Sequence, residues 1–222
     1  MKIAIFGCSW SSGIRSVDDG SCWPYELAKL SPDWKIYNFS SSGTSLIWSL
    51  KNLLDVKHAW KNEDIFYIFQ YTNRNRYTFI NSEFNILNYL QNSSTQNNYH
   101  SITNQIDKHI TKISPANTGQ NNKNEQYNYF QEWIKHHEAY DLPDYISHVS
   151  YIQHSVNFSF FHRHEAVYTD IPTIEDILGK NKFNNYSKDI GNHFGFNGAK
   201  WQAEYIKDII TAHQVQSLLN TI

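Results

Sequence analysis

Three short, largely apolar runs near the N-terminus, residues 2–6, 35–39 and 64–71, each stop at a loop of small polar residues. A run that is apolar on both alternating sides is typical of a strand buried on both faces, as in the interior of a parallel sheet. Helix-like patterns lie between the runs, at 23–30 and from Leu46 onward. This alternation predicts βαβ units and a parallel, doubly wound sheet.

The C-terminal part continues the alternation. We expect a helix at 143–155, a strand at 156–161, a short helix at 174–178 and a last helix from about Gly198. The last helix should pack on the sheet through Ala199, Ala203, Ile206 and Ile210. The helix after the second run should pack through Leu46, Ile47, Leu50, Leu53 and Leu54.

Two polar segments interrupt this pattern. Residues 7–22 are rich in Gly, Ser and Asp and predict a loop. In residues 81–124, Asn, Gln, Ser and Thr dominate, which predicts an insertion that is either a mobile loop or a segment shaping substrate access. Residues 125–140 then look helical. The length of 222 residues favours a single domain, 1–222, carrying this insertion.

Net charge and cysteine content argue against several classes of protein. The formal net charge of −2 gives no electrostatic basis for binding nucleic acid or an anionic membrane. Cys8 and Cys22 cannot build a disulfide framework. We see neither a basic, apolar leader nor an apolar run of about 20 residues. We therefore expect a cytoplasmic protein without nucleic-acid or membrane partners and without a cofactor, and its oligomeric state stays open.

Residues suited to ester cleavage follow the predicted strands and precede the last helix. Such a site needs a hydroxyl nucleophile, a base, a group that orients the base, and oxyanion donors. Ser9 has the hydroxyl, and Gly43 and Asn73 can supply a backbone and a side-chain donor. His193 can act as the base, with Asp189 upstream to accept from its Nδ1–H. Because ligands bind beyond the carboxyl ends of parallel strands, we expect Ser9 at such a crevice.

The order of these residues also carries a family resemblance. The blocks are Gly7-x-Ser9, Asn38-x4-Gly43, Asn73, and the pair Asp189 and His193. In this order they resemble the SGNH (GDSL-type) hydrolases. The resemblance implies a flavodoxin-like, three-layer α/β/α sandwich and a serine esterase that cleaves O-acyl esters, such as carbohydrate O-acetyl groups or other small acyl esters. It implies Ser9 as nucleophile, His193 as base, and Gly43 and Asn73 as oxyanion donors.

A bacterial and phage subset of this family is similar at further positions. Its opening Gly-Cys-Ser-aromatic-Ser/Thr-x-Gly resembles the Gly-Cys-Ser-Trp-Ser-Ser-Gly at 7–13. Its Trp-Pro pair and its Thr-x3-Arg motif resemble the residues at 23–24 and 72–76. The resemblance covers about residues 1–80 and 185–212, and the middle of the chain is unmatched.

Two positions depart from the family pattern. Cys8 stands where an aspartate is usual, which affects hydrogen bonding in the loop rather than the chemical step. The usual Asp-x2-His spacing falls on Ile190, and Asp189 lies one residue earlier. Either the loop absorbs this residue, or a backbone carbonyl orients His193 in a Ser-His dyad. Cys8 as the nucleophile is a weaker alternative, because neighbouring residues at a strand end point in opposite directions.

Each candidate also has an ordinary structural interpretation. Ser9 would cap a helix, Asn73 would make an Asx turn, and His193 would merely start a helix. Candidate substrate contacts are Trp10, Arg74 and Arg76. An arginine fork can hold a substrate carboxylate or phosphate, although arginines in such loops are most often surface charges.

Three alternatives of other kinds stay open. His162 and His164 have a spacing that metals accept, but further ligands are not evident, so we expect no metal site. The loop at 7–13 could bind a phosphate, although it lacks the usual glycine patterns of nucleotide sites. The same fold could instead serve a non-catalytic binding or assembly protein, since fold does not determine function.

Overall fold

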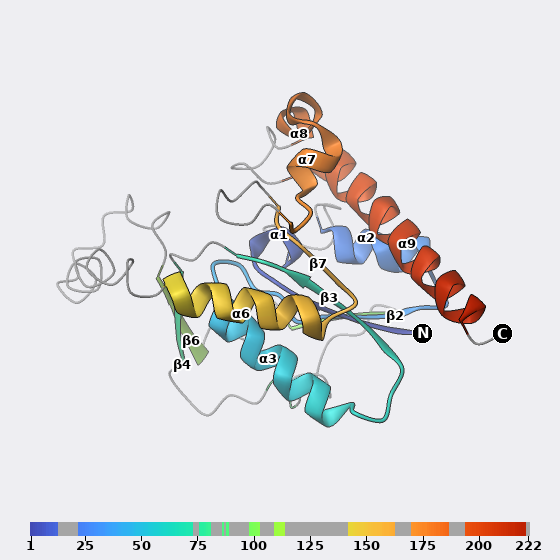
Figure 1. Cartoon of the computed structure of the whole chain (residues 1–222). Coiled ribbons are helices and arrows are strands. Elements are labelled where there is room, and N and C mark those ends of the chain that lie inside the picture. Colours follow the sequence, from blue (N-terminus) through green and yellow to red (C-terminus); the bar gives the residue numbers. More distant parts are fainter. Residues whose placement is uncertain are drawn as a thin grey trace.

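Among the described residues, a parallel sheet of five strands forms the centre of the molecule (Figure 1). The computed structural model describes residues 1–12, 22–72, 76–80, 86, 88, 98–102, 109–113, 142–162, 170–186 and 194–220, apart from the side chains of residues 10, 77, 79, 80, 111–113 and 142. The strands are β1 (Lys2–Phe6), β2 (Lys35–Asn38), β3 (Ile65–Gln70), β5 (Tyr99–Ser101) and β7 (Phe158–Phe160). Their order is β5-β2-β1-β3-β7, and every pairing is parallel.

Helices cover both faces of this sheet, as Figure 1 shows. Helices α2 (Trp23–Leu30) and α9 (Phe196–Leu219) contact each other on one face. Helices α3 (Leu46–Ala59) and α6 (Leu142–Ser155) contact each other on the opposite face. The expected three-layer α/β sandwich is therefore confirmed. The order β2-β1-β3-β7 follows the flavodoxin-like pattern, with β5 added beside β2.

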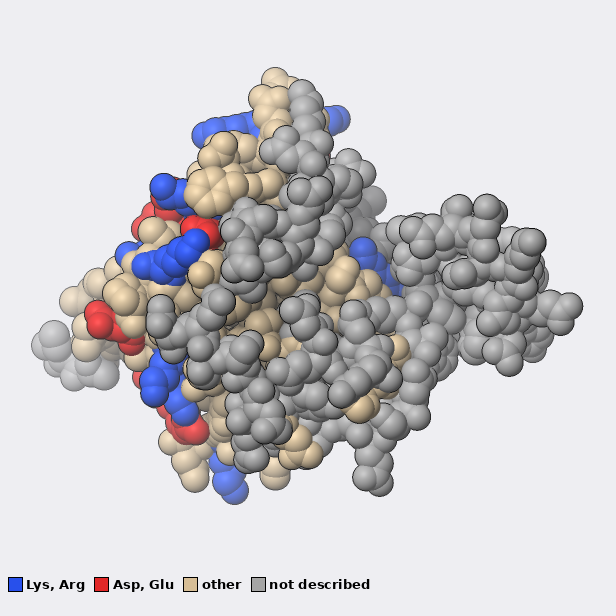
Figure 2. Space-filling model, turned by 180° about the vertical axis from the view of Figure 1, so that it is seen from behind, with Lys and Arg blue, Asp and Glu red and all other residues tan. Residues whose placement is uncertain are grey.

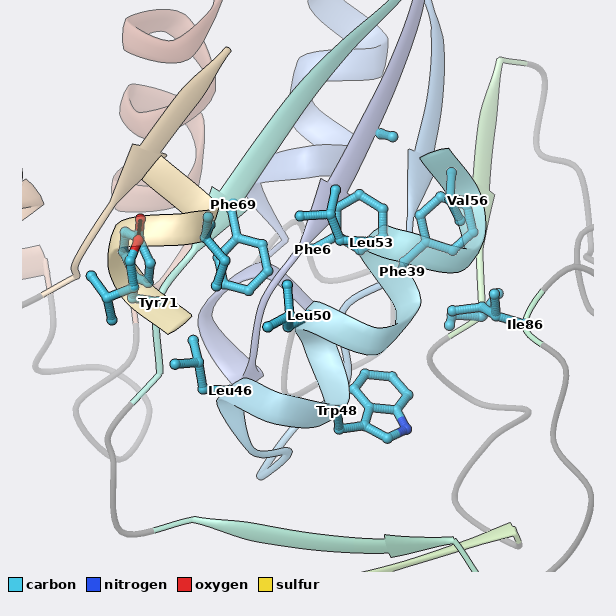
Figure 3. Close-up of a cluster of buried hydrophobic side chains, with 14 of the residues drawn as sticks. Phe6, Phe39, Leu46, Trp48, Leu50, Leu53, Val56, Phe69, Tyr71 and Ile86 are labelled. Carbon is cyan, nitrogen blue, oxygen red and sulfur yellow. Dashed lines mark hydrogen bonds between the residues drawn. The ribbon is translucent and has the colours of Figure 1, made fainter. Parts of the chain in front are cut away.

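Side chains of β1 alternate between two hydrophobic clusters. Ile3 and Ile5 belong to the cluster under α2 and α9, and Phe6 belongs to the cluster under α3 and α6. In the second cluster, Phe6 stacks on Phe39 and on Phe69, with ring centroids 5.1 and 6.4 Å apart (Figure 3). This burial on both faces explains why the first strand is apolar throughout.

The buried face of α3 differs from the one expected. Leu46, Leu50 and Leu53 are buried, but Ile47 is 62% exposed and Leu54 is 42% exposed. Each residue advances the helix by about 100°, so Ile47 and Leu54 lie one step round from the leucines that face the sheet. The rest of the buried face consists of Trp48, Ser49, Asn52 and Val56.

Regular structure also occurs where polar loops were expected. Ser9–Ser12 form a single helical turn, α1, inside the predicted loop at 7–22. In the expected insertion at 81–124, β5 joins the central sheet beside β2, and β6 (Ile110–Ile113) pairs antiparallel with β4 (Tyr77–Ile80). These short strands were not predicted, because pairing with distant strands, not local apolar pattern, determines them.

The remaining C-terminal elements follow the expectation closely. Strand β7 lies within 156–161, and α6 and α7 (Ile174–Leu178) match the expected helices. In α9 the four expected core residues are all buried. Helix α8 (Lys180–Tyr186) was not predicted, and it buries only Phe183 against the core. The expected helix at 125–140 lies outside the described residues.

Candidate active site

The strand order places the candidate site at β1. From β1 the chain passes through α2 to β2, and it then returns through α3, on the opposite face, to β3 on the other side of β1. Open α/β sheets bind ligands at such a reversal, beyond the carboxyl ends of the strands. Ser9 follows β1, Gly43 follows β2 and Thr72 follows β3, so these three residues lie at that edge. Figure 1 shows α1 at the end of β1 away from the chain's N-terminus.

Ser9 is held by the turn that it begins. The Cys8 carbonyl accepts hydrogen bonds from the backbone N–H groups of Ser11 and Ser12 at 3.1 and 2.9 Å. The Ser12 hydroxyl donates to the Ser9 carbonyl at 3.4 Å. Ser9 is 5% exposed. Trp10 lies in the same turn, but its side chain is outside the described part of the structure. The backbone at Ser9 is therefore fixed from both sides.

Gly7 allows the end of β1 to approach the end of β3. A Cβ at position 7 would lie 2.9 Å from the Gln70 Cβ and 3.1 Å from the Ser11 Oγ. The Ser11 hydroxyl donates to the Gln70 side-chain carbonyl, so α1 is bound to β3 directly beside Gly7. The glycine of the Gly-x-Ser block is thus required by close packing, and the same packing positions the turn that carries Ser9.

The loop after β2 is bound to the same glycine. The Gly7 carbonyl lies 3.4 Å from both the Ser41 backbone N–H and the Ser49 hydroxyl, which donate to it. Gly43, in this loop, has a φ of 74°, a left-handed conformation that favours glycine. Ser45 then caps α3 by accepting from the Trp48 backbone N–H at 3.3 Å. The loops that carry Ser9 and Gly43 are therefore parts of one hydrogen-bonded unit.

A buried polar network under α1 strengthens this unit. The Asn38 amide donates to the Ser11 carbonyl at 2.8 Å and to the Tyr99 hydroxyl at 3.0 Å, and its Oδ1 accepts from the Ser40 backbone N–H at 3.0 Å. The Cys22 thiol lies 3.5 Å from the same tyrosine hydroxyl. Burial raises the pKa of Tyr99 well above its ordinary value, so this hydroxyl stays protonated and can donate.

Sequence reasoning missed most of this network. Asn38 was noted only for its spacing to Gly43, and Gln70, Ser11 and Tyr99 were not singled out. One local signal was present at Gln70, because it ends a strand whose other residues are apolar or aromatic. Tyr99 gave no such signal, since its partner Asn38 is 61 residues away along the chain.

Several candidate residues lie outside the described part of the chain: Asn73, Arg74, Asp189 and His193. Whether Asp189 orients His193 therefore stays a prediction. Arg76 is described, is half-buried and directly precedes β4. Cys8 is a buried free thiol. Of the predicted site residues, the structure thus brings Ser9 and Gly43 into one bonded unit.

The residue after His193 is firmly anchored. Phe194 is buried, and its ring packs edge-on against His162, which follows β7, with centroids 4.7 Å apart. A Cβ at Gly198 would lie 2.7 Å from the Phe194 ring, so the start of α9 also packs closely against it. Position 194 therefore lies by the carboxyl end of β7, at the same edge of the sheet as Ser9.

His162 itself is part of the aromatic packing. Besides Phe194, it contacts Phe183, with ring centroids 5.1 Å apart. Among the described residues, no group of three or more His, Cys, Asp and Glu side chains is arranged to hold a metal ion. The position of His162 favours a core histidine over the metal-ligand alternative.

Charged side chains of both signs mix on the surface. On the face shown in Figure 2, Lys and Arg lie beside Asp and Glu along one side of the molecule. Ion pairs join Lys29 to Glu26 at 2.8 Å and Lys51 to Asp55 at 2.6 Å. Within the described ranges, no helix is both long and apolar enough to span a bilayer.

Comparison with known proteins leaves the family open. No protein-family model matches the chain, and no curated protein or solved structure shows a significant match to it. The resemblance to SGNH hydrolases therefore depends on the motif residues alone.

Proposed function

We propose that this chain is a serine esterase of the SGNH type that hydrolyses small O-acyl esters, with Ser9 as the nucleophile. The main support is the joining of the Ser9 turn and the Gly43 loop through the Gly7 carbonyl, at the strand reversal where α/β sheets bind ligands. The Ser9 hydroxyl and two candidate backbone donors, the N–H groups of Ser9 and Gly43, thus belong to loops of one hydrogen-bonded unit. Preorganised donors of this kind are the basis of oxyanion stabilisation.

In the proposed mechanism, His193 removes the hydroxyl proton of Ser9, and Ser9 Oγ attacks the acyl carbon. The Ser9 and Gly43 N–H groups and the Asn73 amide hold the oxyanion. His193 then donates the proton to the departing alcohol, and water hydrolyses the acyl-enzyme. Asp189 would orient His193. The position of Phe194 beside the end of β7 supports His193 as the base, since Phe194 directly follows His193 in the chain and lies at the edge of the sheet where Ser9 lies.

A matched pair of serine variants tests the proposal. Ser9 and Ser31 are both 5% exposed, and Ser31 precedes β2, at the opposite end of the sheet. The Ser31 hydroxyl has no partner among the described residues, so its removal costs no hydrogen bond. Ser9→Ala should abolish p-nitrophenyl acetate hydrolysis, while Ser31→Ala should keep it. Equal hydrolysis by the two variants, both folded by circular dichroism, would show that Ser9 is not the nucleophile.

A non-catalytic binding protein is the second candidate. The low exposure of Ser9 favours it, because a nucleophile has to be reached by its substrate. This candidate predicts that the wild-type protein does not hydrolyse p-nitrophenyl acetate and that Ser9→Ala differs from it only in stability. The same pair of variants therefore decides between the two functions.

A further inference from the structure

The chain that leaves β3 carries buried hydrogen-bonding atoms without partners. Thr72 is 3% exposed, and its Oγ1 is buried and unpaired. One guanidinium nitrogen of Arg76, Nη1, is also buried and unpaired, and so is Nε2 of Gln70 at the end of β3. Buried polar atoms are nearly always hydrogen-bonded in folded proteins, so unpaired atoms at Gln70, Thr72 and Arg76, which are near one another in the chain, are consistent with a ligand or an ordered water.

Two hydrogen bonds fix the chain at Thr72 and at Thr78. The Thr72 carbonyl accepts from the Tyr145 hydroxyl of α6 at 2.5 Å. Two residues beyond Arg76, the Thr78 hydroxyl accepts from the backbone N–H of Ser45 at 2.8 Å, and Ser45 ends the loop after β2. Arg76 therefore lies between the end of β3 and the loop after β2, and both flank the turn that carries Ser9.

The unpaired atoms are suited to one kind of ligand. The amide of Gln70 and the guanidinium of Arg76 are donors, and the hydroxyl of Thr72 can donate. Three of the described lysines have carboxylate partners, among them Lys51, which pairs with Asp55. Arg76 is half-buried, and its buried Nη1 has no hydrogen-bond partner among the described residues. A partly buried cation with an unpaired nitrogen, close in the chain to other unpaired donors, is suited to bind an oxyanion, because a negative charge satisfies such groups.

We propose that Arg76, together with the Thr72 hydroxyl, binds a carboxylate or phosphate group carried by the substrate. The inference rests on the proposed esterase function, because it assigns the anion to an ester substrate. The ester of that substrate would lie at Ser9 and its anionic group at Arg76. The substrate class then narrows to acyl esters with a negative charge near the scissile bond. Arg76 touches the substrate and sets specificity, and no bond is made or broken at its side chain.

Anion binding can be measured apart from hydrolysis. Inorganic phosphate and acetate are titrated into the ¹⁵N-labelled Ser9→Ala protein at constant ionic strength, and the Arg76 Nε–H and Thr72 amide signals are followed by NMR. One of the two anions should shift both signals saturably. In Arg76→Gln the affinity, read from the Thr72 amide, should fall about 10- to 100-fold, the weight of a charge-assisted hydrogen bond. Arg76→Lys keeps the charge but loses the planar fork, so its affinity for the anion should lie between those of the parent protein and Arg76→Gln.

Two controls accompany this titration. Thr72→Val should weaken binding by about two- to tenfold, because it removes one neutral hydrogen bond. Lys51→Gln, which removes an exposed cation on α3, should bind as the parent protein does. Circular dichroism checks that each variant is folded. If Arg76→Gln is unfolded, Arg76→Lys takes its place, and an unchanged affinity in that variant would contradict the proposal.

The outcomes separate this inference from the esterase function. Stronger binding of phosphate indicates a phosphate-bearing substrate, and stronger binding of acetate a carboxylate-bearing one; both support the site. Absence of saturable binding, or equal binding by Arg76→Gln, overturns it, whatever the wild-type protein does to p-nitrophenyl acetate. Anion binding at Arg76 without any hydrolysis would keep the anion site and reject the esterase.

Discussion

The substitution Gly7→Ala tests whether the ends of β1 and β3 approach each other closely beside Ser9. The new Cβ would lie 2.9 Å from the Gln70 Cβ, 3.1 Å from the Ser11 Oγ and 3.2 Å from the Gln70 carbonyl oxygen. Two of these atoms belong to the β3 end, which cannot swing aside as a flexible side chain can. The ends of β1 and β3 must therefore separate, and the hydrogen bond between Ser11 and Gln70 must lengthen.

The magnitude follows from two opposing effects. Overpacking in a well-packed interior costs about 1–3 kcal/mol. Replacing a glycine stabilises by about 0.4–1 kcal/mol through the unfolded chain where the backbone permits alanine. We therefore expect a net loss of about 1–2 kcal/mol in the free energy of unfolding, measured by urea denaturation. If the chain is an esterase, its kcat/KM should fall as well, because the Ser9 turn moves with Gly7.

A second variant shows whether contact with Gln70 is the cause. Gln70→Gly removes the atom nearest to the new Cβ, so Gly7→Ala should cost less in that background, with a coupling energy of at least about 0.5 kcal/mol. A Gly7→Ala protein as stable as the wild type, or more stable, would refute the close approach of β1 and β3. Equal costs in the two backgrounds would refute the role of Gln70.

Two further predictions concern the core and pH. Leu53 is fully buried, whereas its neighbour Leu54 is 42% exposed. Leu53→Ala should therefore lower the free energy of unfolding, measured by urea denaturation, by about 2–5 kcal/mol, and Leu54→Ala should lower it clearly less. Equal losses in the two variants would contradict the orientation of α3. The pKa of His100, whose ring stacks on Tyr37, is lowered by burial and by Lys35, so the folded protein binds this proton more weakly than the unfolded chain. This contribution to stability is present above the ordinary histidine pKa of 6.5 and is lost as the pH falls below that value. As the pH is lowered through this range, the urea midpoint of His100→Asn should therefore fall less steeply than that of the wild-type protein. Identical pH profiles of the two proteins would contradict the lowered pKa.

The central strands could be predicted because their apolar runs are a local signal. Strands β1 and β3 are buried on both faces, and their sequences show it directly. Strand β5 has only three residues, Tyr99–Ser101, and only its first side chain is buried. Its place in the sheet depends on pairing with β2, about which the local sequence says nothing. The exposure of Ile47 likewise follows from how α3 is rotated on the sheet, which its apolar pattern did not determine.

The site was predictable in part for a similar reason. Gly7, Ser9 and Gly43 stand at recognisable spacings after predicted strands, and the structure binds their loops together. The groups that position them were not predictable, because Ser11 meets Gln70 across 59 residues of chain and Asn38 meets Tyr99 across 61. Such contacts exist only once the sheet has formed, so a single sequence gives no pattern for them.

Covalent labelling tests the central claim most directly. A fluorophosphonate probe reacts with a serine only where that serine is activated as a nucleophile. Peptide mass spectrometry of the labelled wild-type protein should locate one adduct on Ser9. The adduct should persist in Ser31→Ala and disappear in Ser9→Ala. A folded wild-type protein that takes up no probe, or takes it up at a residue other than Ser9, would contradict the account.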